Sequence, residues 1–246
     1  MLFSLSQRRI LFAAMGLIAL ATPTFAGEVK TNPKAVLELF TSQGCTSCPP
    51  ADALLKSLDA QPDLITLAYH VDYWDYIGWA DTFGAKANTD RQRAYAAAWQ
   101  SNNIYTPELV VNGAHDFVGS HKPEVDGALA DASLPVPVAL KTEGDMLDVS
   151  IGGKPGGHES GVWLVTFIDN ADVIVARGEN AGKKLSYSQV VTGRHILGMW
   201  DPNTGAHLKL PLDEVLTAPS NGAVILVQSE HGGLPGPIIG AASFVR

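Results

Sequence analysis

The chain has 246 residues with 17 Lys and Arg against 25 Asp and Glu, which gives a formal net charge of −8. Hydrophobic residues make up 46% of the chain and charged residues only 17%, a composition typical of compact globular proteins and unlike disordered or coiled-coil chains. The acidic balance leaves no surplus of basic side chains to neutralise phosphates. Nucleic acid is therefore not an expected partner.

The first 26 residues have the pattern of a secretory signal peptide. Arg8 and Arg9 precede an apolar stretch from Ile10 to Ala21, and small residues follow up to Ala26. We therefore expect cleavage after Ala26 and a periplasmic or secreted mature chain with no stable membrane span. An uncleaved membrane anchor is the alternative, although the apolar run is shorter than the roughly 20 residues that span a bilayer.

Cys45 and Cys48 are the only cysteines of the chain, and an exported protein normally meets an oxidant that joins such a pair. A disulfide across two intervening residues closes a very short loop and stabilises a fold little, so redox chemistry explains the pair better than stability does. The apolar run from Ala35 to Phe40 predicts a buried strand before the pair. Pro49 and Pro50 are tolerated only in the first turn of a helix, so a helix should begin near Cys48.

This helix has apolar residues at helical spacing and is expected to place its polar residues, Asp52 among them, on the opposite face. Free backbone donors at a helix N-terminus favour a thiolate. Cys45 is therefore expected to attack a partner disulfide, and Cys48 to resolve the mixed disulfide. The exchange needs no cofactor, and its partners would be protein or small-molecule thiols and disulfides. The chain offers no second Cys pair for a closed zinc site.

A second predicted strand, from Leu64 to Val71, follows the helix, and a crossover of this kind usually makes the two strands parallel. His70 and Asp72 should therefore lie at the sheet edge that carries Cys45, where open α/β sheets hold ligands. His70 could tune the thiol, or it could bind Cu(I), a soft metal ion, together with Cys45 and Cys48. A hydrogen-bonded structural histidine is the other interpretation.

The segment from Tyr73 to Trp79 supplies four aromatic residues at the same edge, including Trp74 and Tyr76. These rings could provide contact area for an apolar or peptide substrate, or they could pack an irregular loop. Further along, Thr106 and Pro107 stand immediately before an apolar strand that ends at a hairpin turn. The chain thus places several residues that could contact a substrate around one predicted sheet edge.

The order of these features resembles a thioredoxin fold: a strand, a Cys-x-x-Cys pair at the start of a helix, a parallel strand, a Thr-Pro before a third strand, a hairpin and a last helix. The whole chain is also similar to an exported thioredoxin-like family, domain of unknown function 1223 (DUF1223). The matching segments run from Leu39 to Cys45, Cys48 to Asp52, His70 to Asp75 and Tyr105 to Pro107.

The resemblance implies roles for individual residues. The peptide bond between Thr106 and Pro107 should be cis and should lie against the active-site sulfurs, where it helps bind an extended substrate. Thioredoxins also place a buried acid below the second cysteine, and Glu38 is the only acid of the first strand that could be this proton relay. The dipeptide between the cysteines, Thr46-Ser47, differs from that of thioredoxins and leaves the direction of electron flow open.

Pro135 and Pro137 mark a boundary beyond which short apolar segments with alternating polarity replace helical periodicity. Many short strands predict an antiparallel β-sandwich. The predicted organisation is a signal peptide at residues 1–26, an α/β thioredoxin-like domain at 27–133 and an all-β, sandwich-like domain at 134–246. The leading hypothesis is an exported thiol–disulfide oxidoreductase. The alternatives are a Cu(I)-binding or metallochaperone module and a noncatalytic interaction protein whose sandwich domain binds the partner.

Overall fold

The computed structural model of the protein describes residues 28–246, so the predicted signal peptide lies outside the described residues. No helix between these two positions is long and apolar enough to cross a membrane. The secondary-structure elements in chain order are β1 (Glu28–Thr31), β2 (Ala35–Thr41), α1 (Pro49–Asp59), β3 (Leu64–His70), η1 (Asp75–Ile77), α2 (Lys86–Ala98), β4 (Glu108–Val111), β5 (His115–Val118), α3 (Lys122–Ala130), β6 (Val138–Glu143), β7 (Met146–Ile151), β8 (Ser160–Ile174), β9 (Lys184–Trp200), β10 (Ala206–Pro211), α4 (Leu212–Val215), β11 (Gly222–His231) and β12 (Leu234–Val245).

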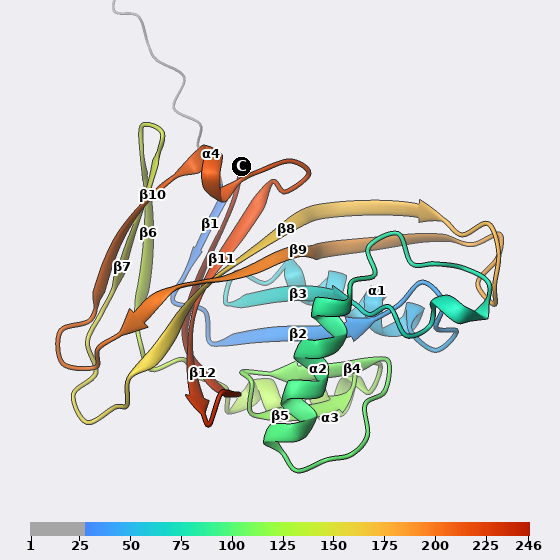
Figure 1. The fold of residues 1–246 in the computed structure, drawn as a ribbon, viewed down its shortest axis with the longest axis horizontal. Helices are drawn as coiled ribbons and strands as arrows, with labels where there is room; N and C mark the ends of the chain where they lie inside the picture. The colour runs from blue at the N-terminus through green and yellow to red at the C-terminus, as the bar shows by residue number, and fades with distance from the viewer. Residues whose placement is uncertain (1–27) are drawn as a thin grey trace, which may run out of the picture.

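Nine strands form one mixed sheet in the order β1-β12-β11-β8-β9-β3-β2-β4-β5, and three form a small antiparallel sheet in the order β10-β7-β6. In the large sheet β3 is parallel to both β2 and β9. The protein is therefore mostly β, with a large mixed sheet and few helices (Figure 1). Strands from both sides of Pro135 share this sheet, because Ala68 of β3 pairs with Val190 of β9.

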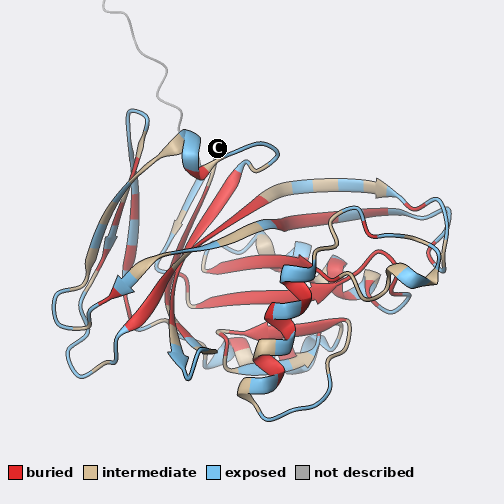
Figure 2. Ribbon diagram, in the orientation of Figure 1, coloured by how far each residue is buried: buried red, intermediate tan, exposed pale blue. Residues whose placement is uncertain are grey.

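Apolar residues alternate along β2 and give this part of the sheet two buried faces. Leu37 and Leu39 pack with residues of α1 and α3 on one face, whereas Val36 and Phe40 pack with Tyr95 of α2 on the other. As a result β2, β3 and β4 are buried along their whole length (Figure 2). Cover by helices on both faces is the usual environment of a parallel strand pair.

The small sheet packs on the C-terminal strands of the large sheet. Val138 of β6 and Val149 of β7 share a hydrophobic core with Val162 of β8, Ile225 of β11 and Phe244 of β12. Two sheets therefore face each other in this half of the chain. The opposite faces of β8 and β11 contribute to the core beneath α2, so one set of strands serves two cores.

β8 and β9 form the longest hairpin, with 15 and 17 residues, where the sequence predicts only short strands. The hairpin lies between β11 and β3 in the sheet. Its far end reaches the side of the molecule where β2 and β3 end (Figure 1). The connection between the two strands, residues 175–183, consequently contacts the segment that carries the cysteines.

Candidate functional site

Cys45 and Cys48 are joined by a disulfide at the start of α1, with their Cα atoms 5.4 Å apart. Cys48 is the residue immediately before the helix, and Pro49 opens it, as the sequence predicts. Both cysteines are almost fully buried, with 2% of Cys45 and 0% of Cys48 exposed, while Thr46 and Ser47 between them are exposed. Of the two cysteines, only Cys45 therefore has surface that a partner could reach.

Ser47 links Cys45 to the segment before β4. Its Oγ lies 3.4 Å from Sγ of Cys45 and 3.5 Å from the carbonyl oxygen of Thr106. The peptide bond between Thr106 and Pro107 is cis, as the resemblance implies. Trp74 Nε1 donates a hydrogen bond to Oγ1 of Thr106 at 2.7 Å. The structure therefore brings Trp74 and the Thr-Pro segment to the same side of the cysteine pair.

Trp74 also packs against the residue that precedes the first cysteine. A Cβ atom added to Gly44 would lie 3.1 Å from Cβ of Trp74 and 3.3 Å from Cδ1 of Ile77. A larger side chain at position 44 would displace these neighbours. Tyr76, by contrast, is 81% exposed. Of the two aromatic residues predicted to contact substrate, one is part of the packed site and the other extends into solvent.

His70 is fully buried beneath the segment that leads to the cysteines. Its Nδ1 lies 2.8 Å from Oδ2 of Asp81, whose carboxylate also accepts hydrogen bonds from the backbone N–H groups of Gln43 and Phe83. Burial would raise the pKa of Asp81, but the charge of His70 and these hydrogen bonds lower it below its ordinary value. The ring of Tyr187 from β9 contacts His70 edge-on, with ring centroids 4.6 Å apart.

The predicted Cu(I) site and the predicted position of Asp72 are the two other features of the sheet edge near Cys45. Within residues 28–246, no group of three or more His, Cys, Asp or Glu side chains is placed to hold a metal ion. Cys45, Cys48 and His70 therefore do not form a metal cluster in this disulfide-bonded state. Asp72 accepts a hydrogen bond from the hydroxyl of Thr89 at 2.6 Å. Asp72 thus connects the end of β3 to α2.

Glu38, the residue considered as a proton relay, lies on the face of β2 opposite α1. Its carboxylate accepts hydrogen bonds of 2.6 to 2.9 Å from Arg91 of α2, and the hydroxyl of Tyr95 donates to it at 2.5 Å. Strand alternation explains this placement, because Leu37 and Leu39 face α1 and the residue between them must face α2. Glu38 is the counter-ion of a buried arginine.

Asp52 is a buried carboxylate of α1, one helical turn after Cys48. The sequence pattern places it on the solvent face of the helix, but that expectation is wrong, because only 6% of Asp52 is exposed. Thr41 donates a hydrogen bond to Oδ1 at 2.7 Å, and Oδ2 has no partner among the described residues. Burial raises the pKa of Asp52 to about 7, against the smaller lowering effects of His70 and Thr41. Such a group gains and loses a proton near neutral pH.

Asn180, from the β8–β9 connection, belongs to the site although no pattern in the sequence predicts it. It is fully buried, and its Nδ2 donates to the carbonyl oxygens of Gln43 at 2.9 Å and of Cys45 at 3.0 Å. Lys183 donates to its Oδ1 at 2.8 Å. The C-terminal half of the chain therefore holds the backbone around the first cysteine.

Comparisons with known proteins agree with the sequence resemblance. The family model for a protein of unknown function, DUF1223, matches residues 36–228. The X-ray crystal structure of protein AGR_C_4864 from Agrobacterium tumefaciens is similar to this one with a TM-score of 0.79 and 35% sequence identity, over 87% of this chain and 95% of that chain. No curated protein matches the sequence. From these similarities, the chain belongs to the DUF1223 family.

Proposed function

We propose that this protein is an exported thiol–disulfide oxidoreductase whose redox centre is the pair of Cys45 and Cys48. The observation that carries the proposal is the disulfide at the start of α1, beside a cis Thr-Pro bond and with Ser47 between the Cys45 sulfur and the Thr106 carbonyl. The start of a helix supplies backbone donors and a positive dipole end that favour a thiolate. Ser47 adds a hydroxyl group 3.4 Å from the Cys45 sulfur.

A thioredoxin-like domain at residues 27–133, with a sandwich-like region at 134–246, is part of this proposal. Its support is the parallel β2–α1–β3 unit, the antiparallel β4 and β5, and α3 packed on the same face as α1. For the second region, the support is the small sheet that packs on β8, β11 and β12. Periplasmic or extracellular location rests on the predicted signal peptide at residues 1–26.

The proposed chemistry exchanges two electrons. In the reducing direction, the Cys45 thiolate attacks one sulfur of a substrate disulfide, a mixed disulfide forms, and the other substrate sulfur leaves as a thiolate that takes up a proton. Cys48 then loses its proton and attacks the Cys45 sulfur, which releases the second substrate thiolate and forms the disulfide present in this structure. The reverse sequence oxidises a substrate dithiol. After substrate reduction, a second dithiol reduces the Cys45–Cys48 disulfide again. After substrate oxidation, a second disulfide oxidises the cysteine pair again.

Asp52 is the group to which we assign the proton of Cys48. Residues one turn apart on a helix are neighbours on the same side, and both of these side chains are buried. A carboxylate with a pKa of about 7 accepts a proton at the pH at which exchange enzymes operate. Trp74 and Thr106 form the packed side of the substrate surface, with Tyr76 extending beyond it.

The first test is a redox titration of the purified protein in glutathione buffers, with the thiols followed by alkylation and mass shift. A reversible two-electron transition between roughly −120 and −270 mV, the range of known dithiol oxidoreductases, is the expected result. A disulfide that resists reduction below about −300 mV would instead be structural. Thiols that remain blocked until a chelator is added would indicate the copper site considered above.

Two variants test the assigned order of attack. Cys45→Ser should abolish insulin disulfide reduction, whereas Cys48→Ser should accumulate a covalent mixed disulfide that is visible on a nonreducing gel. Ser57→Ala is the matched control, because this serine lies on the exposed side of α1 and bonds only within its own helix. Equal turnover by the parent and both cysteine variants would overturn the proposal.

A further inference from the structure

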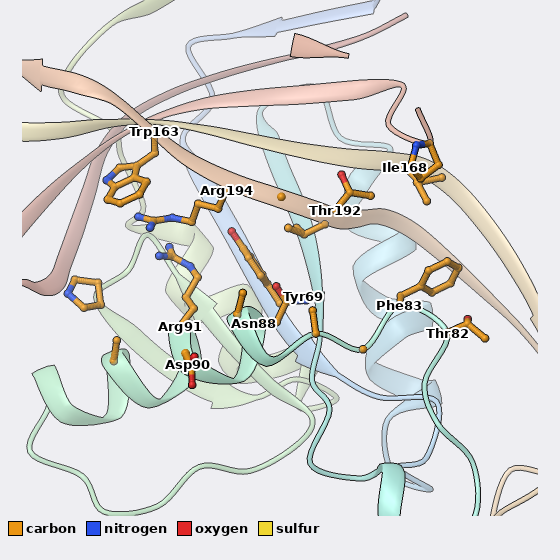
Figure 3. Close-up of a pocket in the computed structure, with 18 of the residues that line it drawn as sticks. Tyr69, Thr82, Phe83, Asn88, Asp90, Arg91, Trp163, Ile168, Thr192 and Arg194 are labelled. Carbon is orange, nitrogen blue, oxygen red and sulfur yellow. The ribbon is translucent and has the colours of Figure 1, made fainter. Parts of the chain in front are cut away.

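A cavity of about 850 Å³ lies against the face of the large sheet that carries α2, whereas the cysteine pair belongs to α1 on the other face. The cavity is bounded by α2, the loop at residues 82–85, β8, β9 and the turn between β11 and β12. In Figure 3, Arg91 of α2 and Arg194 of β9 extend toward the same part of the cavity, beside the ring of Trp163. Its volume is in the range of small-molecule sites, about 300–1,000 Å³.

Arg91 and Arg194 share a single buried carboxylate, that of Glu38. Arg91 forms an ion pair with Glu38, with a shortest N–O distance of 2.6 Å. Among the described residues, Arg194 makes a single hydrogen bond, from Nη2 to Oε1 of Gln228 at 3.1 Å, and Arg91 shares that acceptor at 3.3 Å. The buried Nε of Arg194 has no partner there, although a guanidinium carries several donors. The group of Arg91, Arg194 and Glu38 thus has one uncompensated positive charge.

No nearby acid supplies the missing counter-ion. Burial and then the charge of Arg91 lower the pKa of Arg194 to about 10. Asp90 and Glu230 also line the cavity, but both are exposed. Asp90 is paired with Lys86 at 2.6 Å, and solvent screens an exposed carboxylate such as Glu230. Arg194 therefore remains the cation that a ligand could neutralise.

The rest of the cavity is shaped for an apolar group. Cζ of Arg194 lies over the Trp163 ring, 3.2 Å from its centroid, so the guanidinium contacts the face of the indole. Trp163 Nε1 is a second buried donor without a partner among the described residues. Apolar side chains complete the walls, among them Phe83, Ile168 and Val191. A ligand that satisfies these surroundings has hydrogen-bond acceptors at one end and an apolar body.

We infer that this cavity binds a small carboxylic acid with an apolar chain or ring, with its carboxylate on Arg194 and its apolar part against the Phe83 side of the cavity. A monoanion matches the single uncompensated charge. The planar carboxylate also matches the fork of guanidinium donors, which favours two parallel hydrogen bonds. This inference is independent of the redox proposal, because the disulfide contributes no lining residue.

The test uses octanoate as the probe and octanamide as its uncharged match, each titrated calorimetrically into the purified oxidised protein. Octanoate should bind saturably at one site, and octanamide at least about tenfold more weakly, because a charged hydrogen-bonded pair is lost. Absence of saturable octanoate binding would overturn the inference. Equal affinity for the two probes would also overturn it, since the arginine would then have no part in recognition.

Variants locate the site on the protein. Arg194→Gln should weaken octanoate binding at least about tenfold, and Arg194→Lys should restore only part of the affinity because an ammonium lacks the planar fork. Arg93→Gln is the matched control, because it removes the same charge from the exposed side of α2, outside the cavity. Unchanged binding by Arg194→Gln would place the ligand elsewhere. The comparison of the two probes needs no variant, so a folding defect would not obscure the result.

Discussion

Glu38 and Asp52 are both buried carboxylates, but they lie on opposite faces of the sheet and have different partners. Glu38 is held by the guanidinium of Arg91 and the hydroxyl of Tyr95. Asp52 has a hydrogen bond from Thr41 and no ion pair within the described chain. A carboxylate paired with arginine acts as a fixed negative charge, whereas an unpaired buried carboxylate retains its proton toward neutral pH.

This difference divides the chemistry of the two faces. On the face that carries α2, charge is used to hold the fold together and, in our inference, to receive an anion. On the face that carries α1, a buried titratable group, Asp52, lies one helical turn after Cys48. Variants on the two faces test this division, and Glu38→Gln has the largest expected effect.

Glu38→Gln should be strongly destabilising, because it leaves the buried Arg91 and the half-buried Arg194 side by side without a carboxylate. The expected loss is about 3–5 kcal/mol in the free energy of unfolding, measured by urea denaturation of the oxidised protein. Glu143→Gln is the control, since it breaks only exposed ion pairs, with Lys141 and Lys209. A Glu38→Gln protein of parent stability that exchanges disulfides slowly would reverse the roles of the two carboxylates.

Asp52→Asn should remove a pH dependence of stability. Burial raises the pKa of Asp52 from its ordinary 3.8 to about 7, so the folded state binds this proton more tightly than the unfolded state. The resulting stability is complete below about pH 4 and is lost as the pH rises through about 7, by up to about 4 kcal/mol. Urea denaturation at pH 5 and pH 8 measures the change.

Asp126→Asn is the control for this experiment, because Asp126 is exposed and paired with Lys122 on α3. In the disulfide-exchange assay, Asp52→Asn should also lower the rate and flatten its dependence on pH around neutrality. A variant with the same pH dependence as the parent, in both stability and rate, would remove Asp52 from the proton chemistry.

Asn180→Ala tests whether the β8–β9 connection holds the backbone around Cys45. The substitution removes the side-chain donor from the carbonyl oxygens of Gln43 and Cys45, and the Cys45 oxygen keeps a 3.3 Å hydrogen bond from the backbone N–H of Cys48. We expect a loss of about 2 kcal/mol in stability and faster proteolysis near the cysteines. Asn170→Ala, at an exposed hydrogen bond with Asp169, should have little effect. Equal losses for the two variants would mean that this contact does not hold the site.

Trp74→Phe should have the smallest effect. It removes the hydrogen bond from Nε1 to the hydroxyl of Thr106 but retains an aromatic ring. We expect a cost of about 1 kcal/mol in substrate binding, seen as an increase in KM for a disulfide substrate with kcat nearly unchanged. A large fall in kcat with unchanged KM would instead assign Trp74 to the chemical step.

The parts of the site that depend on local sequence could be predicted. The apolar run of β2, the paired prolines at the start of α1 and the Thr-Pro before β4 are each recognisable within a few residues, and the structure has all three. Asp52 also carries a local signal, its spacing of one helical turn from Cys48. Its polar character predicts the solvent-facing side of α1, which is wrong, because sequence patterns treat a carboxylate as exposed unless a partner is known.

The parts that depend on distant segments could not be predicted. Asn180 stands 135 residues after Cys45, and no local pattern indicates that it will bond to that backbone. The orientation of Glu38 depends on the register of β2, and an offset of one residue reverses the face of every side chain. The pairing of β3 with β9 joins two regions that differ in composition, so the chain divides more clearly in sequence than in space.

This pairing has a consequence for how the protein can be shortened. A fragment that stops at residue 133 would leave β3 with one edge unpaired, because β9 occupies that edge in the whole protein. All seven residues of β3 are buried, and they include Leu64, Ile65 and Leu67. A long, apolar and uncovered strand edge promotes association between chains. By covering this edge, β9 of the C-terminal half prevents the association that an uncovered β3 would promote.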